Sequence, residues 1–307
     1  MAEGSTTAWT GGTEHWTRKG DVRLFLWHKE AAAGAPKRGT VFFVHGSSMA
    51  SQPTFDLFVP GRADSSAMDW FCARGFDTWT MDNEGYGRSD KSRPQNNDIS
   101  NGADDLAAGL DHVRSTTGAQ KVHMYGISSG ALKAALFAQR HPERVDRLAL
   151  DAFVWTGEGS PTLAERKKKL AQFAAVHRRP IDRAFVRSIF TRDHPGTADD
   201  ATIEAFADAI LALDDSVPTG TYVDMCSKLP LVDPAKIVNP TLVMRGEYDG
   251  IAGFDDLVEF FKRLPNADKQ FTVMAGISHA SFQQKNYRTV YHVLHAFLTQ
   301  PEPVYRT

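Results

Sequence analysis

The sequence contains very little cysteine. Its 307 residues include only two, Cys72 and Cys226, which lie far apart and without Cys-x-x-Cys spacing. A disulfide framework needs several cysteines, and a cysteine-based zinc site needs closely spaced pairs. Neither is supported here, and we expect both thiols to be reduced and to act as ordinary packing residues.

Long apolar runs are also missing. No stretch approaches the roughly 18 uninterrupted apolar residues that a membrane-spanning helix needs. The beginning of the chain, MAEGSTTAWTGGTEHWTRKG, has no basic region followed by an apolar segment. We therefore expect a soluble, cytoplasmic protein with no membrane partner.

The sequence has no excess of basic residues. The formal net charge is −2 and the isoelectric point is near 6.6, so the chain lacks the electrostatic footprint of a nucleic-acid-binding protein. The longest basic run, residues 166–169, is interpreted as a solvated helix face. Nucleic acid is therefore not an expected partner.

Extended segments alternate regularly with helical patterns along most of the chain. The extended candidates are residues 23–28, 40–45, 76–81, 122–125, 148–153, 241–244 and 270–274. TVFFVHG and PTLVMRG are continuous apolar runs, as expected for strands buried on both faces. Residues 98–113 carry apolar side chains at helical spacing. The alternation predicts an α/β fold with a mostly parallel sheet and helices on both faces.

The regular alternation stops between residues 155 and 234. This stretch is charged and helix-like, as in DDATIEAFADAILALDD, and it contains turn signals such as His194-Pro195-Gly196. A chain of 307 residues is long enough for one large domain with an insertion. We predict a sheet domain made of residues 1–154 and 235–307, with a helical insertion over residues 155–234.

The segment Gly126-Ile127-Ser128-Ser129-Gly130 stands where an apolar run changes into a helical pattern. A flexible loop would explain the glycines without any chemistry. Alternatively, glycines on both sides leave room for a strained strand-to-helix turn that exposes a serine hydroxyl in a cleft. The context favours the second interpretation, in which Ser128 is the nucleophile and Ser129 contributes its backbone N–H.

A serine nucleophile needs a base, and the base needs an acid that orients it. Asp249 follows the apolar segment TLVMRG and His279 follows FTVMAG, so both are expected just beyond the carboxyl ends of strands. We predict His279 as the base and Asp249 as the acid. Asp151, at the end of RLALD, is a rival for the acid.

The loop His45-Gly46-Ser47-Ser48 follows another predicted strand. A backbone N–H in this loop, best that of Ser47, is expected to pair with the N–H of Ser129 in an oxyanion hole. His45 is interpreted as a buried residue that shapes the loop. Residues 82–89 are interpreted as a structural turn near the site.

Together these residues make the chain resemble the α/β-hydrolase superfamily from about residue 40 to residue 298. The motifs are HGSS, DNEGYGRS, GISSG, GEYDG and GISHASF, and the order Ser, Asp, His is that of the superfamily. The resemblance implies a triad of Ser128, His279 and Asp249, and a cap domain over residues 155–234. It implies no metal and no organic cofactor.

Fold and triad together predict a two-step acyl transfer. The expected reaction is hydrolysis of a small or medium carboxylic ester, the small-molecule partner of the protein. The alternative is hydrolysis of a carbon–carbon bond in a ring-fission diketone, of an amide or of a lactone. A third reading, a non-catalytic binding protein, conflicts with the complete triad. Phe153, Trp155 and Met225 are candidates for substrate contact, and packing in the core or the cap is the equal alternative for them. An oligomer is compatible with the sequence, which does not specify it.

Overall fold

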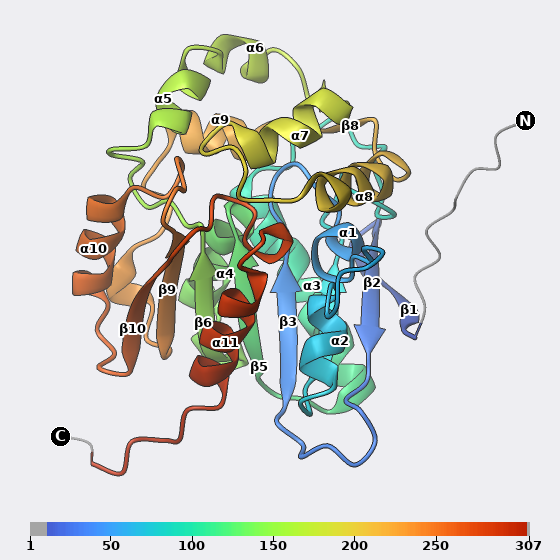
Figure 1. Ribbon diagram of the computed structural model, residues 1–307, viewed down its shortest axis with the longest axis vertical. Helices are drawn as coiled ribbons and strands as arrows, with labels where there is room; N and C mark the ends of the chain where they lie inside the picture. Colours follow the sequence, from blue (N-terminus) through green and yellow to red (C-terminus); the bar gives the residue numbers. More distant parts are fainter. Residues whose placement is uncertain (1–10, 306–307) are drawn as a thin grey trace, which may run out of the picture.

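The computed structural model describes residues 11–305, and an eight-stranded sheet forms its centre (Figure 1). The sheet order is β1-β2-β4-β3-β5-β6-β9-β10. The strands are β1 (Thr13–Lys19), β2 (Val22–Lys29), β3 (Thr40–Val44), β4 (Asp77–Met81), β5 (Val122–Ile127), β6 (Val145–Asp151), β9 (Thr241–Gly246) and β10 (Lys269–Met274). From β4 to β10 all neighbours are parallel. Residues 1–10 and 306–307, which the predicted core ranges include, lie outside the described residues.

The predicted α/β fold is confirmed, since every segment predicted as extended is a strand of this sheet. The antiparallel edge strand β1 was not predicted. Its sequence, TEHWTRK, is polar and none of its residues is fully buried, so it lacks the apolar run of an interior strand. It pairs with β2 through a hairpin whose turn contains Gly20 at φ 56°. Cys72 and Cys226 are buried free thiols, as predicted.

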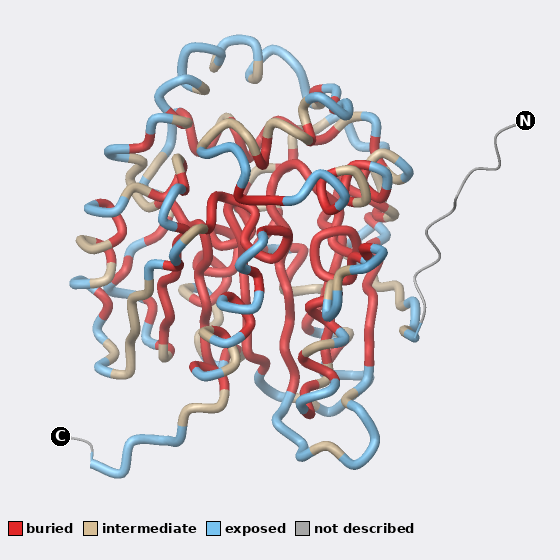
Figure 2. The backbone as a smooth tube through the Cα atoms, viewed as in Figure 1, coloured by how far each residue is buried: buried red, intermediate tan, exposed pale blue. Residues whose placement is uncertain are grey.

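Helices cover both faces of the sheet, and Figure 2 shows the strands buried between them. One face packs against α3 (Ile99–Thr117), α4 (Ser129–Arg140) and α10 (Phe254–Arg263), and the other against α2 (Ala67–Cys72) and α11 (Tyr287–Leu298). Successive side chains of β3 point to opposite faces of the sheet, so Phe42 packs in the core on the first face and Phe43 in the core on the second. Within residues 11–305, no helix combines the length and the apolar character needed to cross a membrane.

The predicted helix over residues 98–113 is α3, which runs four residues further. Its first turn is capped by Asp98, whose side chain accepts a hydrogen bond from the N–H of Asn101 at 2.9 Å. Its last turn ends at Gly118, which adopts the left-handed conformation at φ 77°. A short helix, α1 (Ser51–Phe55), lies in the segment between β3 and β4.

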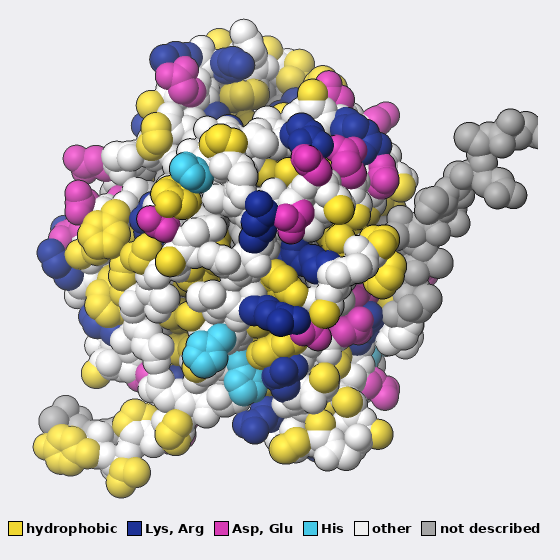
Figure 3. Space-filling view, viewed as in Figure 1, with side chains coloured by type: hydrophobic (Ala, Val, Ile, Leu, Met, Phe, Trp, Pro, Cys, Tyr) yellow, Lys and Arg dark blue, Asp and Glu magenta, His cyan; other side chains and the backbone are white. Residues whose placement is uncertain are grey.

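The segment 155–234 lies beyond the carboxyl ends of the parallel strands, at the top of Figure 1. It contains α5 (Pro161–Lys167), α6 (Leu170–Ala174), α7 (Arg183–Thr191), α8 (Asp200–Leu211), α9 (Gly220–Ser227) and the short pair β7 (Arg178–Pro180) and β8 (Ser216–Pro218). Helices α7 and α8 share a hydrophobic cluster that includes Phe190 and Phe206. Arg183 and Arg187 of α7 pair with Glu204 of α8, and Figure 3 shows basic and acidic side chains beside one another over these helices.

The turn from β5 into α4 is held by backbone contacts at two glycines. A Cβ on Gly126 would lie 2.5 Å from the carbonyl oxygen of Gly130, and one on Gly130 would lie 2.6 Å from that of His45. Neither glycine has a positive φ, so the close approach itself excludes a side chain. Between them, Ser128 adopts φ 58°, a strained conformation for a residue with a side chain. The packing of α4 against the end of β3 therefore fixes this turn.

We expect Gly130→Ala to lower the free energy of unfolding by about 3 kcal/mol, because an added methyl group must displace backbone. Gly118→Ala is the matched control. No atom lies within 4 Å of a Cβ at Gly118. The only expected effect of alanine there is the strain of its positive φ, which lowers the free energy of unfolding by about 1 kcal/mol. Urea unfolding followed by circular dichroism measures both, and equal losses would show that close approach is not the constraint at Gly130.

Candidate active site

Ser128, His279 and Asp249 meet at the carboxyl edge of the sheet. His279 Nε2 lies 2.9 Å from Ser128 Oγ, and His279 Nδ1 lies 3.1 Å from each carboxylate oxygen of Asp249. All three residues are buried. This hydrogen-bonded chain can carry a proton from the hydroxyl to the imidazole while the carboxylate orients the ring.

Three strand ends position these side chains. Ser128 follows β5, Asp249 follows β9 and His279 follows β10. The loops after β9 and β10 touch, because a Cβ on Gly246 would lie 2.6 Å from the carbonyl oxygen of Ser278. The N–H of Tyr248 also donates to the carbonyl oxygen of Ile277 at 2.9 Å. Close packing of these loops brings the carboxylate to the imidazole.

The surroundings of Asp249 favour its ionised form. Its Oδ1 accepts hydrogen bonds from the N–H groups of Ile251 at 2.8 Å and Ala252 at 3.2 Å. Burial alone would raise the pKa of Asp249, but His279 and these N–H donors outweigh burial and lower the pKa to about 2. Asp249 therefore carries a negative charge next to the imidazole at neutral pH.

Asp151 has different surroundings. Its Oδ2 accepts a hydrogen bond from the Tyr125 hydroxyl at 2.5 Å, and no hydrogen bond joins it to His279 among the described residues. Burial raises the pKa of Asp151 to about 7. The geometry thus separates the two candidate acids: Asp249 faces the imidazole and Asp151 faces a phenol.

The loop after β3 packs directly against Ser128. A Cβ on Gly46 would lie 3.4 Å from the Cβ of Ser128. Within residues 11–305, the N–H groups of Ser47 and Ser129 donate no hydrogen bond. Two unpaired donors therefore lie close to Ser128, on the loop after β3 and at the start of α4.

His45 and the predicted turn over residues 82–89 hold this loop in place. His45 Nδ1 contacts the carbonyl oxygen of Gly46 at 2.8 Å, and its Nε2 accepts the N–H of Asn83 at 3.0 Å. Burial lowers the pKa of His45 well below its usual range, which matches a neutral ring that donates on one side and accepts on the other. The Tyr86 hydroxyl donates to the carbonyl oxygen of Ser47 at 3.3 Å.

A cavity of about 680 Å³ is lined by residues of the segment 155–234 and by Gly250, which directly follows Asp249. Its lining includes Arg166, Arg179, Arg192, Asp193, Tyr222 and Gly250. Sequence reasoning identified none of these residues as part of the site. In the run over residues 166–169, the three lysines are exposed as predicted, but Arg166 is partly buried and lines the cavity, as does Lys169 at the end of the run.

The three candidates for substrate contact, Phe153, Trp155 and Met225, do not line this cavity. Phe153 is fully buried in the core, where its ring packs 4.7 Å from that of Phe260. Met225 belongs to the same core cluster. Trp155 lines a different hollow and donates its indole N–H to the carbonyl oxygen of Val232 at 3.1 Å. The structure does not bring any of them to the cavity beside the triad.

Asp193, Asp249 and His279 form one group of metal-ligand type, with potential ligand atoms within 4.8 Å of one another. The Asp249 oxygens and His279 Nδ1 already bond to each other. His279 Nε2 bonds to Ser128. Because these atoms are engaged in the triad, we assign no metal to the group.

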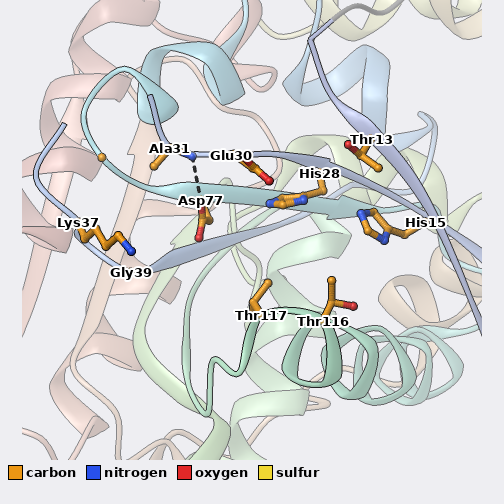
Figure 4. Close-up of a pocket in the computed structure, with 11 residues that line it drawn as sticks. Thr13, His15, His28, Glu30, Ala31, Lys37, Gly39, Asp77, Thr116 and Thr117 are labelled. Carbon is orange, nitrogen blue, oxygen red and sulfur yellow. Dashed lines mark hydrogen bonds between the residues drawn. The ribbon is translucent and has the colours of Figure 1, made fainter. Parts of the chain in front are cut away.

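A second hollow, shown in Figure 4, lies at the opposite edge of the sheet. Its side chains include His15, His28 and Asp77, and the Asp77 carboxylate accepts the N–H of Ala31 at 2.9 Å. Asp77 begins β4, whereas the triad residues follow the carboxyl ends of their strands. This hollow is therefore separate from the triad.

The comparison with solved structures agrees with the sheet topology. A soluble variant of monoglyceride lipase from Saccharomyces cerevisiae, in complex with a substrate analog, superposes with a TM-score of 0.71 at 18% identity and covers 97% of each chain. A thermophilic esterase from Thermogutta terrifontis has a TM-score of 0.66 at 21% identity and covers 94% of this chain and 98% of its own. At these identities the likeness concerns the fold.

Sequence comparison extends the likeness to a family. The Pseudomonas putida protein named 2-hydroxy-6-oxononadienedioate/2-hydroxy-6-oxononatrienedioate hydrolase 2 is 26% identical over 265 residues, which cover 81% of this chain and 84% of that protein. The family described as "Serine aminopeptidase, S33" matches residues 35–286. The chain therefore belongs to the serine aminopeptidase S33 family and is a hydrolase of the α/β-hydrolase superfamily.

Proposed function

We propose that this hydrolase cleaves a small or medium carboxylic ester through an acyl-enzyme on Ser128. The observation that carries the proposal is the hydrogen-bonded chain from Ser128 Oγ through His279 to Asp249. As Oγ attacks the carbonyl carbon, its proton passes to His279 Nε2, and the ionised Asp249 stabilises the imidazolium that forms.

The N–H groups of Ser47 and Ser129 are the proposed donors to the oxyanion of the tetrahedral intermediate. When the intermediate collapses, the alcohol leaves with the proton from His279, and the acyl group stays on Ser128 Oγ. Water then gives a proton to His279 and attacks the acyl carbon. Ser128 Oγ leaves, recovers its proton from His279, and the carboxylic acid is released.

We also propose that residues 155–234 act as a cap on a core made of residues 1–154 and 235–307. In support, helices of this segment lie over the carboxyl ends of the strands (Figure 1). Arg179 of the segment donates to the carbonyl oxygen of Ser47 at 3.3 Å, next to the nucleophile. A covered cavity selects small molecules over extended lipid surfaces.

Carbon–carbon bond hydrolysis by the same triad is the second candidate, favoured by the similarity to the Pseudomonas putida 2-hydroxy-6-oxononadienedioate hydrolase. The family description, serine aminopeptidase, favours the amide variant of the same chemistry. A panel of p-nitrophenyl esters, aryl amides, lactones and vinylogous diketones separates these reactions. Turnover of the diketones or the amides without turnover of any ester would overturn the ester proposal.

We expect Ser128→Ala to lower kcat by at least about 10⁴-fold, because the acyl group then has no oxygen to bond. Alanine fits the space of serine, so the unfolding transition should remain cooperative. The measurement is initial-rate kinetics on the best substrate of the panel, with covalent labelling by a fluorophosphonate probe as the second readout. A variant that keeps a tenth of the wild-type rate, or still takes up the probe, would exclude Ser128 as the nucleophile.

Asp249→Asn should lower kcat by roughly 10³- to 10⁴-fold, since an amide cannot stabilise the imidazolium and can favour the wrong tautomer. Asp151→Asn is the matched control, with the same change at a buried aspartate that faces Tyr125. We expect it to change kcat less than about tenfold. Steady-state kinetics of the two variants decide the assignment, which the reverse ranking would contradict.

The same control variant tests the raised pKa of Asp151. Below about pH 4 its carboxyl is protonated in both folded and unfolded chains. Between about pH 4 and 7 it is ionised only in the unfolded chain, so its contribution to stability falls as pH rises towards the folded pKa of about 7. Asp151→Asn removes this loss. In urea unfolding, the free energy of unfolding of the variant minus that of the wild type should rise by on the order of 1 kcal/mol per pH unit across that window. A difference that does not change with pH would contradict the raised pKa.

A further inference from the structure

Three arginines from separate elements converge on one tyrosine in the cavity above the triad. Arg166 comes from α5, Arg179 from β7 and Arg192 from the end of α7. The guanidinium carbons of Arg166 and Arg179 lie 4.3 Å and 4.1 Å from the ring centre of Tyr222. All four side chains line the cavity of about 680 Å³. We call Arg166, Arg179 and Arg192 the arginine cluster.

Two members of the arginine cluster have no acidic partner. Among residues 11–305, no carboxylate oxygen lies within 4 Å of the nitrogens of Arg166 or Arg179. Arg179 is only 8% exposed and its Nε is buried without a hydrogen bond, as is Nη1 of Arg166. A buried guanidinium that lacks a counter-ion and leaves one of its N–H donors without a hydrogen bond is unfavourable. An anion in the cavity would satisfy these donors.

The acidic side chains of the cavity leave this positive charge uncompensated. Glu165 is exposed and pairs with Lys168 on the surface. Asp193 accepts a hydrogen bond from Thr162 at 2.9 Å and lies 3.4 Å from Nε of Arg192. It therefore offsets the charge of Arg192 alone.

The pKa of the Tyr222 phenol shows the effect of this positive charge. Burial would raise the pKa of Tyr222, but the positive charges of Arg166, Arg179 and Arg192 outweigh burial and lower the pKa to about 7. The hydroxyl lies 3.4 Å from Ser48 Oγ. A group that ordinarily ionises near pH 10 is thus drawn toward its anionic form, as expected where an anion is stabilised.

The arginine cluster adjoins the nucleophile. Arg179 Nη2 donates to Ser48 Oγ at 2.7 Å and to the carbonyl oxygen of Ser47 at 3.3 Å, on the loop that packs against Ser128. On the other side, Gly250 lines the cavity directly after Asp249. The arginine cluster therefore lies next to the loop after β3 and next to the residue that follows Asp249.

We propose that the substrate carries a free carboxylate, which the arginine cluster binds while the scissile group lies at Ser128. Guanidinium groups bind carboxylates through two parallel hydrogen bonds, which also fixes the orientation of the ligand. The substrate class is a half ester of a short dicarboxylic acid. This inference rests on the proposed ester hydrolysis for the nature of the scissile group, and on the cavity alone for the carboxylate.

The kinetic test compares matched ester pairs. Monoethyl succinate, glutarate and adipate are each measured against the neutral ethyl ester in which a methyl ketone replaces the carboxylate. At one chain length at least, the acid should have a kcat/KM at least tenfold above that of its neutral partner. Arg166→Gln should reduce that ratio at least tenfold. Acid and neutral esters turned over equally at all lengths would overturn the proposal.

Lys168→Gln is the matched control, because it removes the same charge from the same basic run at a side chain that is 68% exposed. It should leave the ratio within twofold of the wild type. An equal fall in both variants would mean that general surface charge attracts the acid, and would contradict the site. Arg166→Lys keeps the positive charge but not the planar guanidinium. Its ratio of kcat/KM for acid over neutral ester should therefore lie between that of Arg166→Gln and that of the wild type.

A binding measurement separates this proposal from the catalytic one. Calorimetry with Ser128→Ala measures succinate, glutarate and adipate directly, without turnover. At least one should bind, and adding Arg166→Gln should weaken its binding at least tenfold. If that holds while no ester is cleaved, the carboxylate site stands and ester hydrolysis fails. If esters are cleaved without acid preference and no diacid binds, ester hydrolysis stands and the carboxylate site fails.

Discussion

The candidate active site depends on the contact between the turn after β5 and the end of β3. At Gly126 and Gly130 the backbones approach so closely that a methyl group would collide with a carbonyl oxygen. This packing holds Ser128 at φ 58° and ψ −125°, a conformation that an isolated chain would rarely adopt. It also places the free N–H of Ser129 beside the loop that contains Ser47. One steric constraint thus positions both the hydroxyl and the two donors.

Buried charge is distributed unevenly around this turn. Asp249 is held ionised by His279 and two backbone N–H groups, whereas Asp151 has a pKa raised by burial beside Tyr125. In a low-dielectric interior, the hydrogen bonds offered to a carboxylate decide whether it keeps its charge. In the cavity, Arg166 and Arg179 of the arginine cluster have no carboxylate partner within residues 11–305. The lining of the cavity includes Gly250, directly after Asp249, but not Asp249 itself.

Much of the fold and the order of the proposed catalytic residues are visible in the sequence, because both depend on local patterns. Interior strands such as β3 and β9 are buried along their whole length and carry continuous apolar segments, since both their faces are covered. Ser128 and Asp249 follow interior strands and His279 follows the edge strand β10, and parallel strands place their carboxyl ends at one edge. The polar edge strand β1 lacks this signature and was missed for that reason.

The sequence by itself determined the alternation of strands and helices, the glycines that permit the turn at Ser128, and the chain order of the triad. Only the tertiary structure decided which aspartate reaches His279, and that Arg166 lines the cavity while Lys167 and Lys168 face solvent. It also placed Phe153 and Met225 in the core, whereas the sequence left core packing and substrate contact open for both. The reason is physical. The periodicity of apolar residues indicates which side of a helix or strand is buried, but the residues that bury it come from distant parts of the chain. Only tertiary packing brings such distant residues together.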